Sequence, residues 1–128
     1  GVDIRIGTDG AASSGNGLNL LHEARLASLV QRHDHWESTL LPAQDIFKIA
    51  TKESKDWVAW NLDDIRMRPL GRSNNRHLAN LVYNGGDCLD VLVNGQFLRK
   101  NGTTLTLDEQ QIIDELDNAV HSYYDGVE

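Results

Sequence analysis

The sequence has little cysteine, proline or methionine, no long apolar run and no excess of positive charge. Its 128 residues include a single cysteine, Cys88, which excludes a disulfide within the chain and favours a reducing compartment such as the cytoplasm. No stretch approaches the roughly 20 apolar residues that span a bilayer, and no signal-peptide pattern is visible. The net charge of −7 disfavours nucleic acid or an anionic membrane as a partner, because both need clustered lysine and arginine.

The length suits one domain and permits a buried core. The chain begins with Gly1 rather than Met and enters a strand pattern almost at once, so we expect it to be processed or cut from a longer protein. The acidic residues are spread along the sequence, with one concentration in the last third. A well-solvated surface is the simplest interpretation of that charge.

The first stretch that suggests chemistry is Val2–Gly10. Its apolar residues alternate with polar ones over Val2–Ile6, which predicts a β-strand. Asp9 follows the predicted carboxyl end of that strand, in a run of small residues where other atoms can approach closely. Spacing alone favours a turn aspartate that bonds its own backbone, although a carboxylate at this position is also common in α/β enzymes.

A family resemblance favours the second alternative, a carboxylate that takes part in chemistry. Gly7–Ser13, followed by Leu20–Ala27, resembles the last barrel strand and next helix of the metal-dependent amidohydrolase superfamily. The similarity is to its deaminase branch, which includes methylthioadenosine/S-adenosylhomocysteine deaminases, purine deaminases and triazine hydrolases. Further segments match in the same order: Leu41–Ala43, Ala50–Thr51, Leu62–Asp64, Arg66–Met67, Asn80–Tyr83, Val93–Gly95 and Leu105–Glu109. The resemblance therefore covers nearly the whole chain, but only the C-terminal part of the family's enzyme.

The resemblance implies an α/β fold: the C-terminal fragment of a TIM-barrel amidohydrolase plus part of a small β-sandwich. Residues 1–54 would be the last barrel strand and C-terminal barrel helices, 55–105 a β-sandwich remnant with a hairpin, and 106–128 a C-terminal helix. The family's loop and short strand after the second helix are missing here, because Lys55 and Asp56 lead directly into a predicted strand over Trp57–Leu62.

Two helices are expected in the first part of the chain. One runs over Gly17–Gln31, capped by Asn16 or Asn19, and is apolar on so much of its circumference that it needs cover from several sides. The other begins near Pro42, runs to about Lys52 and carries an apolar stripe. Between them, His33 and His35 form an HxH pair; we interpret it as part of a polar surface loop rather than a metal site.

The second half contains one strong turn signal. Asn94-Gly95 separates two strand patterns, over Cys88–Val93 and Gln96–Arg99, and predicts a hairpin with a type I′ turn. The preceding basic segment, from Arg66 to Asn75, is interpreted as a solvated loop and 77–83 as a short helical turn. Thr106 and Glu109 form a capping box that predicts a last helix to about Tyr124.

The resemblance assigns one residue of this chain to the chemistry. Asp9 would be a metal ligand and a proton shuttle, with zinc as the expected divalent metal and iron as the alternative. The chain's histidines do not match the family's ligand positions, so the metal would be held only together with the missing barrel strands. Ser13, Ser14 and Cys88 lie in no recognisable nucleophile motif, and Cys88 fits a small core residue better.

Two functions remain open. The chain is either the C-terminal part of a hydrolase that acts on C–N bonds of a purine-like or related heterocyclic amine, inactive on its own, or a non-catalytic small domain or truncated remnant that binds a partner chain. Both predict an oligomer or association with the missing part of the enzyme, because the apolar sides of the first helix need cover.

Overall fold

The structure is a computed structural model that describes residues 2–12, 17–51, 55–72 and 74–126. Its elements follow the order α1 (Leu20–His35), α2 (Ala43–Ala50), β1 (Trp57–Trp60), the 3-10 helix η1 (Ile65–Met67), α3 (Asn74–Asn84), β2 (Cys88–Val93), β3 (Gln96–Lys100), β4 (Thr103–Thr104) and α4 (Glu109–Asp125). These form two compact units: residues 1–54 with 60–87, and residues 55–59 with 88–128. The α/β class is therefore confirmed.

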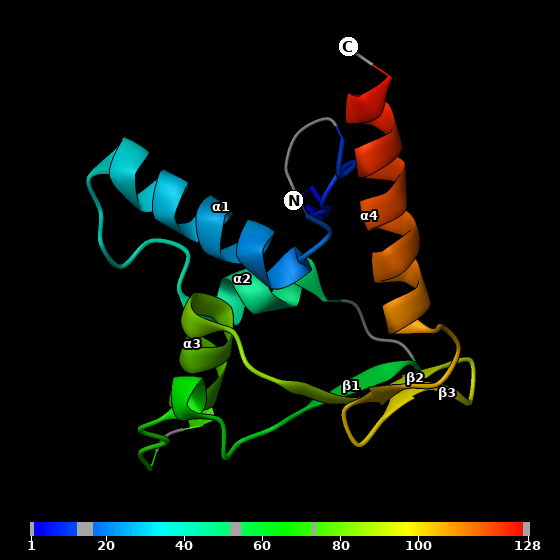
Figure 1. The fold of residues 1–128 in the computed structure, drawn as a ribbon. Helices are drawn as coiled ribbons and strands as arrows, with labels where there is room; N and C mark the ends of the chain where they lie inside the picture. Colours follow the sequence, from blue (N-terminus) through cyan, green and yellow to red (C-terminus); the bar gives the residue numbers. More distant parts are fainter. Residues whose placement is uncertain (1, 13–16, 52–54, 73, 127–128) are drawn as a thin grey trace. The chain divides into compact units, whose positions relative to one another are not determined.

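The first unit is built on three helices that pack together, α1, α2 and α3 (Figure 1). Its buried core joins one residue of α1, two of α2 and one of α3: Ala24, Ala43, Ile46 and Val82. Partly buried apolar residues surround them, among them Ile6, Phe47 and Ala50. The apolar stripe predicted for the second helix is thus the side of α2 that faces the core.

Helix α1 begins where its sequence provides a cap. Asn19 Oδ1 accepts hydrogen bonds from the backbone N–H groups of Leu21 and His22, at 3.1 and 3.3 Å, so the Asn19 alternative is confirmed. Asn16 lies outside the described residues. The helix continues four residues past the predicted end and stops at Trp36, which adopts a left-handed conformation with φ 51°. The expected loop at His33 and His35 is therefore wrong: both belong to the last turn of α1.

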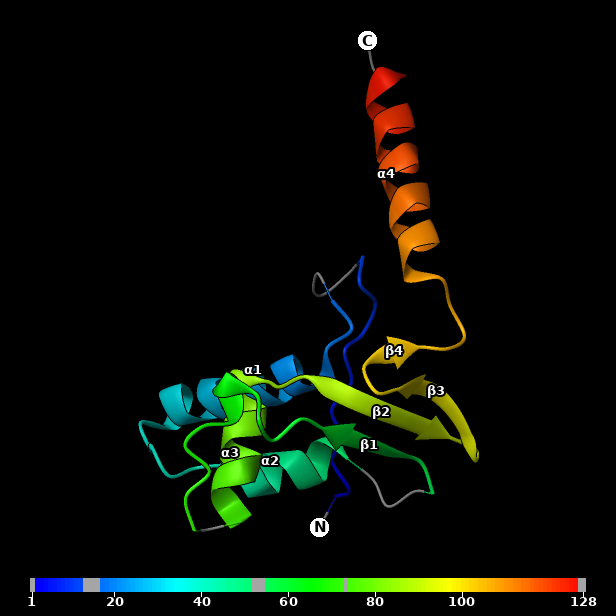
Figure 2. The ribbon, with the colours of Figure 1, turned by 60° about the horizontal axis from the view of Figure 1, so that its bottom comes forward.

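The second unit contains an antiparallel hairpin in a four-stranded sheet with the order β1-β2-β3-β4 (Figure 2). Asn94 and Gly95 turn the hairpin with φ of 51° and 80°, which confirms the predicted I′-type turn. Val93 pairs with Gln96 and Leu92 with Phe97, and a bulge follows at Val91. Sequence reasoning did not predict β4, which pairs with β3 after a second turn.

Two predicted features of the second half are wrong. Thr106 does not cap the last helix; the N-cap is Asp108, whose Oδ1 accepts from the Gln111 N–H at 3.0 Å. Asp caps a helix at least as well as Thr, and the Glu109 carboxylate accepts instead from Arg99 and from the Thr104 hydroxyl. The short helical turn expected at 77–83 is the full helix α3.

The strand predicted at Val2–Ile6 is also absent: within the described part of the chain, residues 2–10 form no strand. A strand exists only through hydrogen bonds to a neighbour, and alternation of side chains alone does not supply one. Val2 and Ile4 are 89% and 62% exposed, and only Ile6 packs against the core. No helix among the described residues has both the length and the apolar character needed to cross a membrane.

Candidate functional site

The segment that carries Asp9 is attached to the first unit at two points. Ile6 contacts the core cluster, and the Arg5 guanidinium donates to the Thr51 carbonyl, just after α2, at 3.3 Å. Arg5 also pairs with Asp3 at 3.1 Å. These contacts hold the chain along the C-terminal end of α2 and lead it to Asp9.

Asp9 itself is exposed and lies in a left-handed backbone conformation, with φ 53°. Its Oδ1 accepts a hydrogen bond from the Gly10 N–H at 2.7 Å. This is the geometry of a turn aspartate, and Asp is among the residues that tolerate such a φ.

The described residues do not form a metal site by themselves. They contain no group of three or more histidine, cysteine, aspartate or glutamate side chains placed to hold an ion. His33 stacks on Trp36 with ring centroids 6.0 Å apart, and His35 Nδ1 lies 3.1 Å from the Gln31 carbonyl oxygen. Both histidines are therefore engaged locally on α1.

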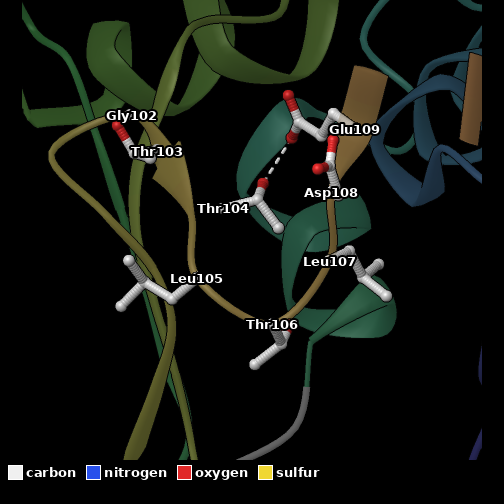
Figure 3. A pocket seen from close by; sticks show the side chains of 8 residues that line it. All are labelled: Gly102, Thr103, Thr104, Leu105, Thr106, Leu107, Asp108 and Glu109. Carbon is white, nitrogen blue, oxygen red and sulfur yellow. Dashed lines mark hydrogen bonds between the residues drawn. The ribbon is translucent and has the colours of Figure 1, made fainter. Parts of the chain in front are cut away.

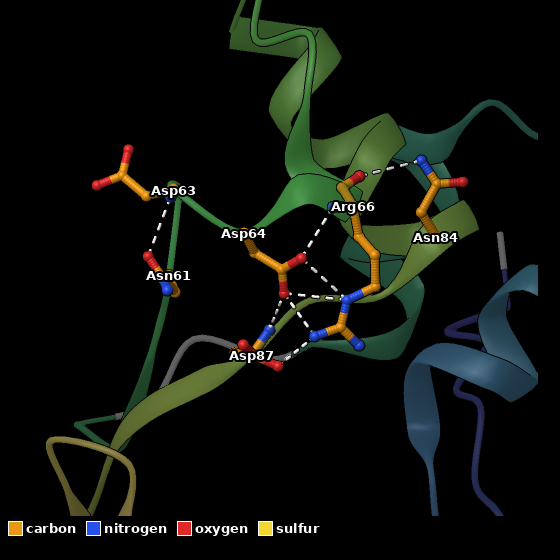
Figure 4. Close-up of polar contacts among 6 residues, drawn as sticks. All are labelled: Asn61, Asp63, Asp64, Arg66, Asn84 and Asp87. Atoms are coloured by element: carbon orange, nitrogen blue, oxygen red, sulfur yellow. Dashed lines mark hydrogen bonds and ion pairs between the residues drawn. The ribbon is translucent and has the colours of Figure 1, made fainter.

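The most connected polar cluster was not predicted from the sequence. Asp64 is buried and receives the Arg66 guanidinium, with Nη2 at 2.5 Å from Oδ2, and the backbone N–H of Arg66 at 2.8 Å (Figure 4). It also accepts from the Asp87 N–H at 2.9 Å, and Arg66 pairs in addition with the Asp87 carboxylate. The bonds from the Arg66 side chain and backbone hold the pKa of Asp64 at about 2, well below the usual value.

The interpretation of Arg66–Asn75 as a solvated loop is wrong at both ends, because the segment begins in η1 and ends in α3. Arg66 is bound by Asp64 and Asp87, and Arg68 pairs with Asp63 at 2.5 Å. Two of the arginines are thus neutralised by acids of the same unit. Arg66 joins the segment after β1 to Asp87, which follows α3, whereas the pair of Arg68 and Asp63 lies within that segment.

A hollow of about 630 Å³ lies in the second unit, lined by residues 102–109 (Figure 3). Its one glutamate, Glu109, is already bound by Thr104 and Arg99. A smaller hollow of about 140 Å³ lies between the start of α1 and the end of α3, and includes His22, Arg25 and Tyr83. Neither hollow contains Asp9.

Cys88 is partly buried at the start of β2. Burial raises the pKa of its thiol, and the nearby Arg99 only partly offsets this. A raised pKa reduces the thiolate fraction that nucleophilic chemistry requires, which agrees with a packing role. Ser13 and Ser14 lie outside the described residues.

Among the described residues the structure is an α/β arrangement in which Asp9 is an exposed turn aspartate. The chain is 33% identical to a 5-methylthioadenosine/S-adenosylhomocysteine deaminase of Pyrococcus abyssi, over 89% of this chain and 30% of the relative. Proteins of the same name from Pyrococcus furiosus and Bacillus cereus are 35% and 34% identical, each over 90% of this chain. The resemblance to these deaminases is therefore confirmed.

The chain spans only about 30% of the length of these relatives. A solved adenosine deaminase from Xanthomonas campestris, with bound zinc, shares the fold with a TM-score of 0.78 and 23% identity, over 91% of this chain and 30% of that structure. No family model matches the sequence. The chain is thus similar, over nearly its whole length, to a part of a deaminase.

Proposed function

We propose that this chain is the C-terminal part of a metal-dependent aminohydrolase, which releases ammonia from a purine-like or related heterocyclic amine. The observation that carries the proposal is the similarity to deaminases over about nine-tenths of the chain. Residues 1–54 would complete the barrel, 55–105 would belong to the small β-sandwich, and 106–128 would be a C-terminal helix. The divalent metal would be zinc, with iron as the alternative, because the structural neighbour contains zinc.

The donors of the described residues do not suffice for a metal, so the ion would be held mainly by the missing part of the enzyme. When bound, such an ion lowers the pKa of a water molecule to about 7 and so supplies a nucleophile. Asp9 would add one ligand from the end of the anchored segment.

Asp9 would also move a proton. A carboxylate accepts a proton on an oxygen and can then donate it to a leaving amine, which a departing ammonia needs. The contacts of Ile6 and Arg5 limit how far the segment can move, and a general base must stay within hydrogen-bond reach of its proton. Arg5 and Ile6 would therefore be positioning residues for Asp9.

The test is Asp9→Asn in the intact enzyme, with Asp34→Asn as the matched control. Asp34 is an exposed aspartate of α1 whose side chain pairs with His35, not with the positioning residues of Asp9. Asn preserves the shape but is a poor base, so turnover should fall at least about 10²-fold in Asp9→Asn, the usual scale for loss of a general base. Asp34→Asn should stay close to the parent. Ammonia release from adenine-type nucleosides and metal content per protein are the two measurements.

The same experiments distinguish the proposed function from the alternative, a non-catalytic domain that binds a partner chain. The 128-residue chain alone should bind zinc weakly and release no ammonia under the proposal. Full activity of Asp9→Asn in the intact enzyme would contradict the role of Asp9. Tight, stoichiometric zinc binding by the chain through its own histidines would contradict the dependence on missing strands.

A further inference from the structure

The sheet of the second unit contains the same dipeptide in two of its turns. Asn94-Gly95 joins β2 to β3, and Asn101-Gly102 joins β3 to β4. In each pair the asparagine is followed by the backbone nitrogen of a residue without a side chain, so that nitrogen can approach the asparagine amide carbon closely. Asparagine followed by glycine is for this reason the sequence most prone to spontaneous deamidation. The sequence alone therefore indicates both asparagines equally.

The two asparagines have closely similar surroundings. The backbone φ is 51° at Asn94 and 49° at Asn101, and it is 80° and 79° at the glycines that follow. The backbone N–H of each asparagine donates to an aspartate Oδ1, from Asn94 to Asp56 at 2.8 Å and from Asn101 to Asp90 at 2.7 Å. Both asparagines are exposed, and all of these residues belong to the second unit. Each pair is thus an internal control for the other.

The two pairs differ at the glycine nitrogen. The Gly102 N–H donates to the Leu89 carbonyl of β2 at 2.8 Å, and Gly102 is half-buried. Gly95 is exposed, and among the described residues its N–H has no acceptor. The bond that closes a two-residue turn is made instead by the next residue, here Gln96, which pairs with Val93. The nitrogen that attacks in deamidation is therefore bonded in one pair and unbonded in the other.

Deamidation at the first pair is a balanced reaction with water alone. The Gly95 nitrogen loses its proton to hydroxide and attacks Asn94 Cγ; the new N–Cγ bond closes a succinimide ring, the Cγ–Nδ2 bond breaks, and Nδ2 leaves as ammonia with a proton from water. Water then opens the ring at either carbonyl and leaves aspartate or isoaspartate. At Gly102 the same attack first requires the bond to Leu89 to open. We infer that Asn94 is a deamidation site of this protein and that Asn101 is protected.

The products alter the turn in which they form. Aspartate at position 94 places a carboxylate on the residue whose N–H already binds the Asp56 carboxylate, so like charges repel there. Isoaspartate also lengthens the backbone of the turn by a CH2 group, and turn length fixes the register of Val93 against Gln96. Deamidation therefore weakens the hairpin and its link to the segment before β1. None of these steps involves Asp9 or the proposed hydrolysis of a heterocyclic amine.

The test is peptide mapping of the full 128-residue chain after incubation at mildly alkaline pH. Mass spectrometry follows the replacement of NH by O at each asparagine, and chromatography separates aspartate from isoaspartate peptides. Asn94 should react at least about tenfold faster than Asn101, the scale on which one backbone hydrogen bond protects. In guanidinium chloride the bond of Gly102 is lost, so the two rates should converge.

Two further measurements examine the cause of the difference. The Gly95 N–H should exchange its hydrogen rapidly in the folded chain and the Gly102 N–H slowly. Asn94→Gly should abolish the faster reaction and leave the rate at Asn101 unchanged, because Gly-Gly also suits a type I′ turn. Asn94→Asp, which supplies one product directly, should speed hydrogen exchange at the Gln96 N–H that closes the turn.

Several outcomes would overturn the inference. Equal deamidation of Asn94 and Asn101 in the folded chain, or a faster reaction at Asn101, would remove the role of the Gly102 hydrogen bond. Slow hydrogen exchange at Gly95 would show that its N–H is bonded in solution. Protection of Asn94 in the intact enzyme would show that the rest of the protein holds this turn, and the site would then be wrong. Unchanged exchange at Gln96 in Asn94→Asp would contradict the weakening of the hairpin.

Discussion

The core of the first unit can be tested at Ile46, whose side chain is 1% exposed and lies with Ala24, Ala43 and Val82. Ile46→Ala removes about three carbon groups, which at roughly 0.8 kcal/mol each is about 2.4 kcal/mol of lost burial. A cavity cost adds to this, within the range of about 2–5 kcal/mol that such truncations show. Because the surrounding shell is partly exposed and can relax, we expect a total of about 3 kcal/mol.

The measurement is urea unfolding followed by circular dichroism. With a slope of about 2 kcal/mol/M, a loss of about 3 kcal/mol lowers the midpoint by about 1.5 M. Ile46→Val should cost only about 0.5–1.5 kcal/mol, because one methyl group is removed. Leu26→Ala on α1 is the matched control: its side chain is 48% exposed, and alanine favours the helix, so the loss should be under about 1 kcal/mol.

The comparison of Ile46→Ala with Leu26→Ala tests whether Ile46 lies at the centre of a packed core. If Ile46→Ala and Leu26→Ala lower the urea midpoint equally, then Ile46 does not lie at the centre of a packed core. The arrangement of α1, α2 and α3 around it would then be wrong.

Three further predictions concern single contacts. Asn19→Ala should destabilise the protein by about 0.5–2 kcal/mol in urea unfolding, because two N–H groups of α1 lose their acceptor; no change would contradict the cap. Gly95→Val should cost about 1–2 kcal/mol because φ is 80°, whereas Gly7→Val, with open space and no positive φ, should cost far less in the same titration. The folded pKa of Asp64, about 2, lies below its unfolded value, so its stabilisation is complete above about pH 4 and is lost as pH falls toward 2. The stability difference between the parent and Asp64→Asn should therefore shrink over that range in urea titrations at pH 5, 3 and 2, and a constant difference would contradict the ion pair.

Structural features that depend on residues close together in the sequence could be predicted from it. Asn94-Gly95 specified its turn because few dipeptides adopt two positive φ angles, and the stripe on α2 specified its buried side. The end of α1 was missed because no glycine marks it: the helix stops at Trp36, a residue that rarely adopts a left-handed conformation. Thr106 and Asp108 are both good caps two residues apart, and the pattern does not choose between them.

Contacts between residues far apart in the chain could not be predicted from the sequence. Asp64 and Asp87 are far apart in the chain, and nothing in either segment indicates that the Asp87 N–H meets the Asp64 carboxylate. The alternation at Val2–Ile6 was correct as a pattern, but a strand needs a partner that the described residues do not provide. Asp9 was identified through the family resemblance, since its spacing alone fits an ordinary turn.

The polar cluster around Asp64 has a consequence for how this part of the sequence can change. The Asn61 N–H donates to the Asp87 carbonyl at 2.8 Å, and Asp87 also contacts Asp64 and Arg66. The two ends of the stretch from Asn61 to Asp87 therefore lie side by side. Segments whose ends lie side by side tolerate insertion and exchange, because the flanking backbone need not move. In the stretch from Asn61 to Asp87 we therefore expect changes of length to be tolerated only in the exposed part around Pro69 and Arg72, because α3 supplies Val82 to the core.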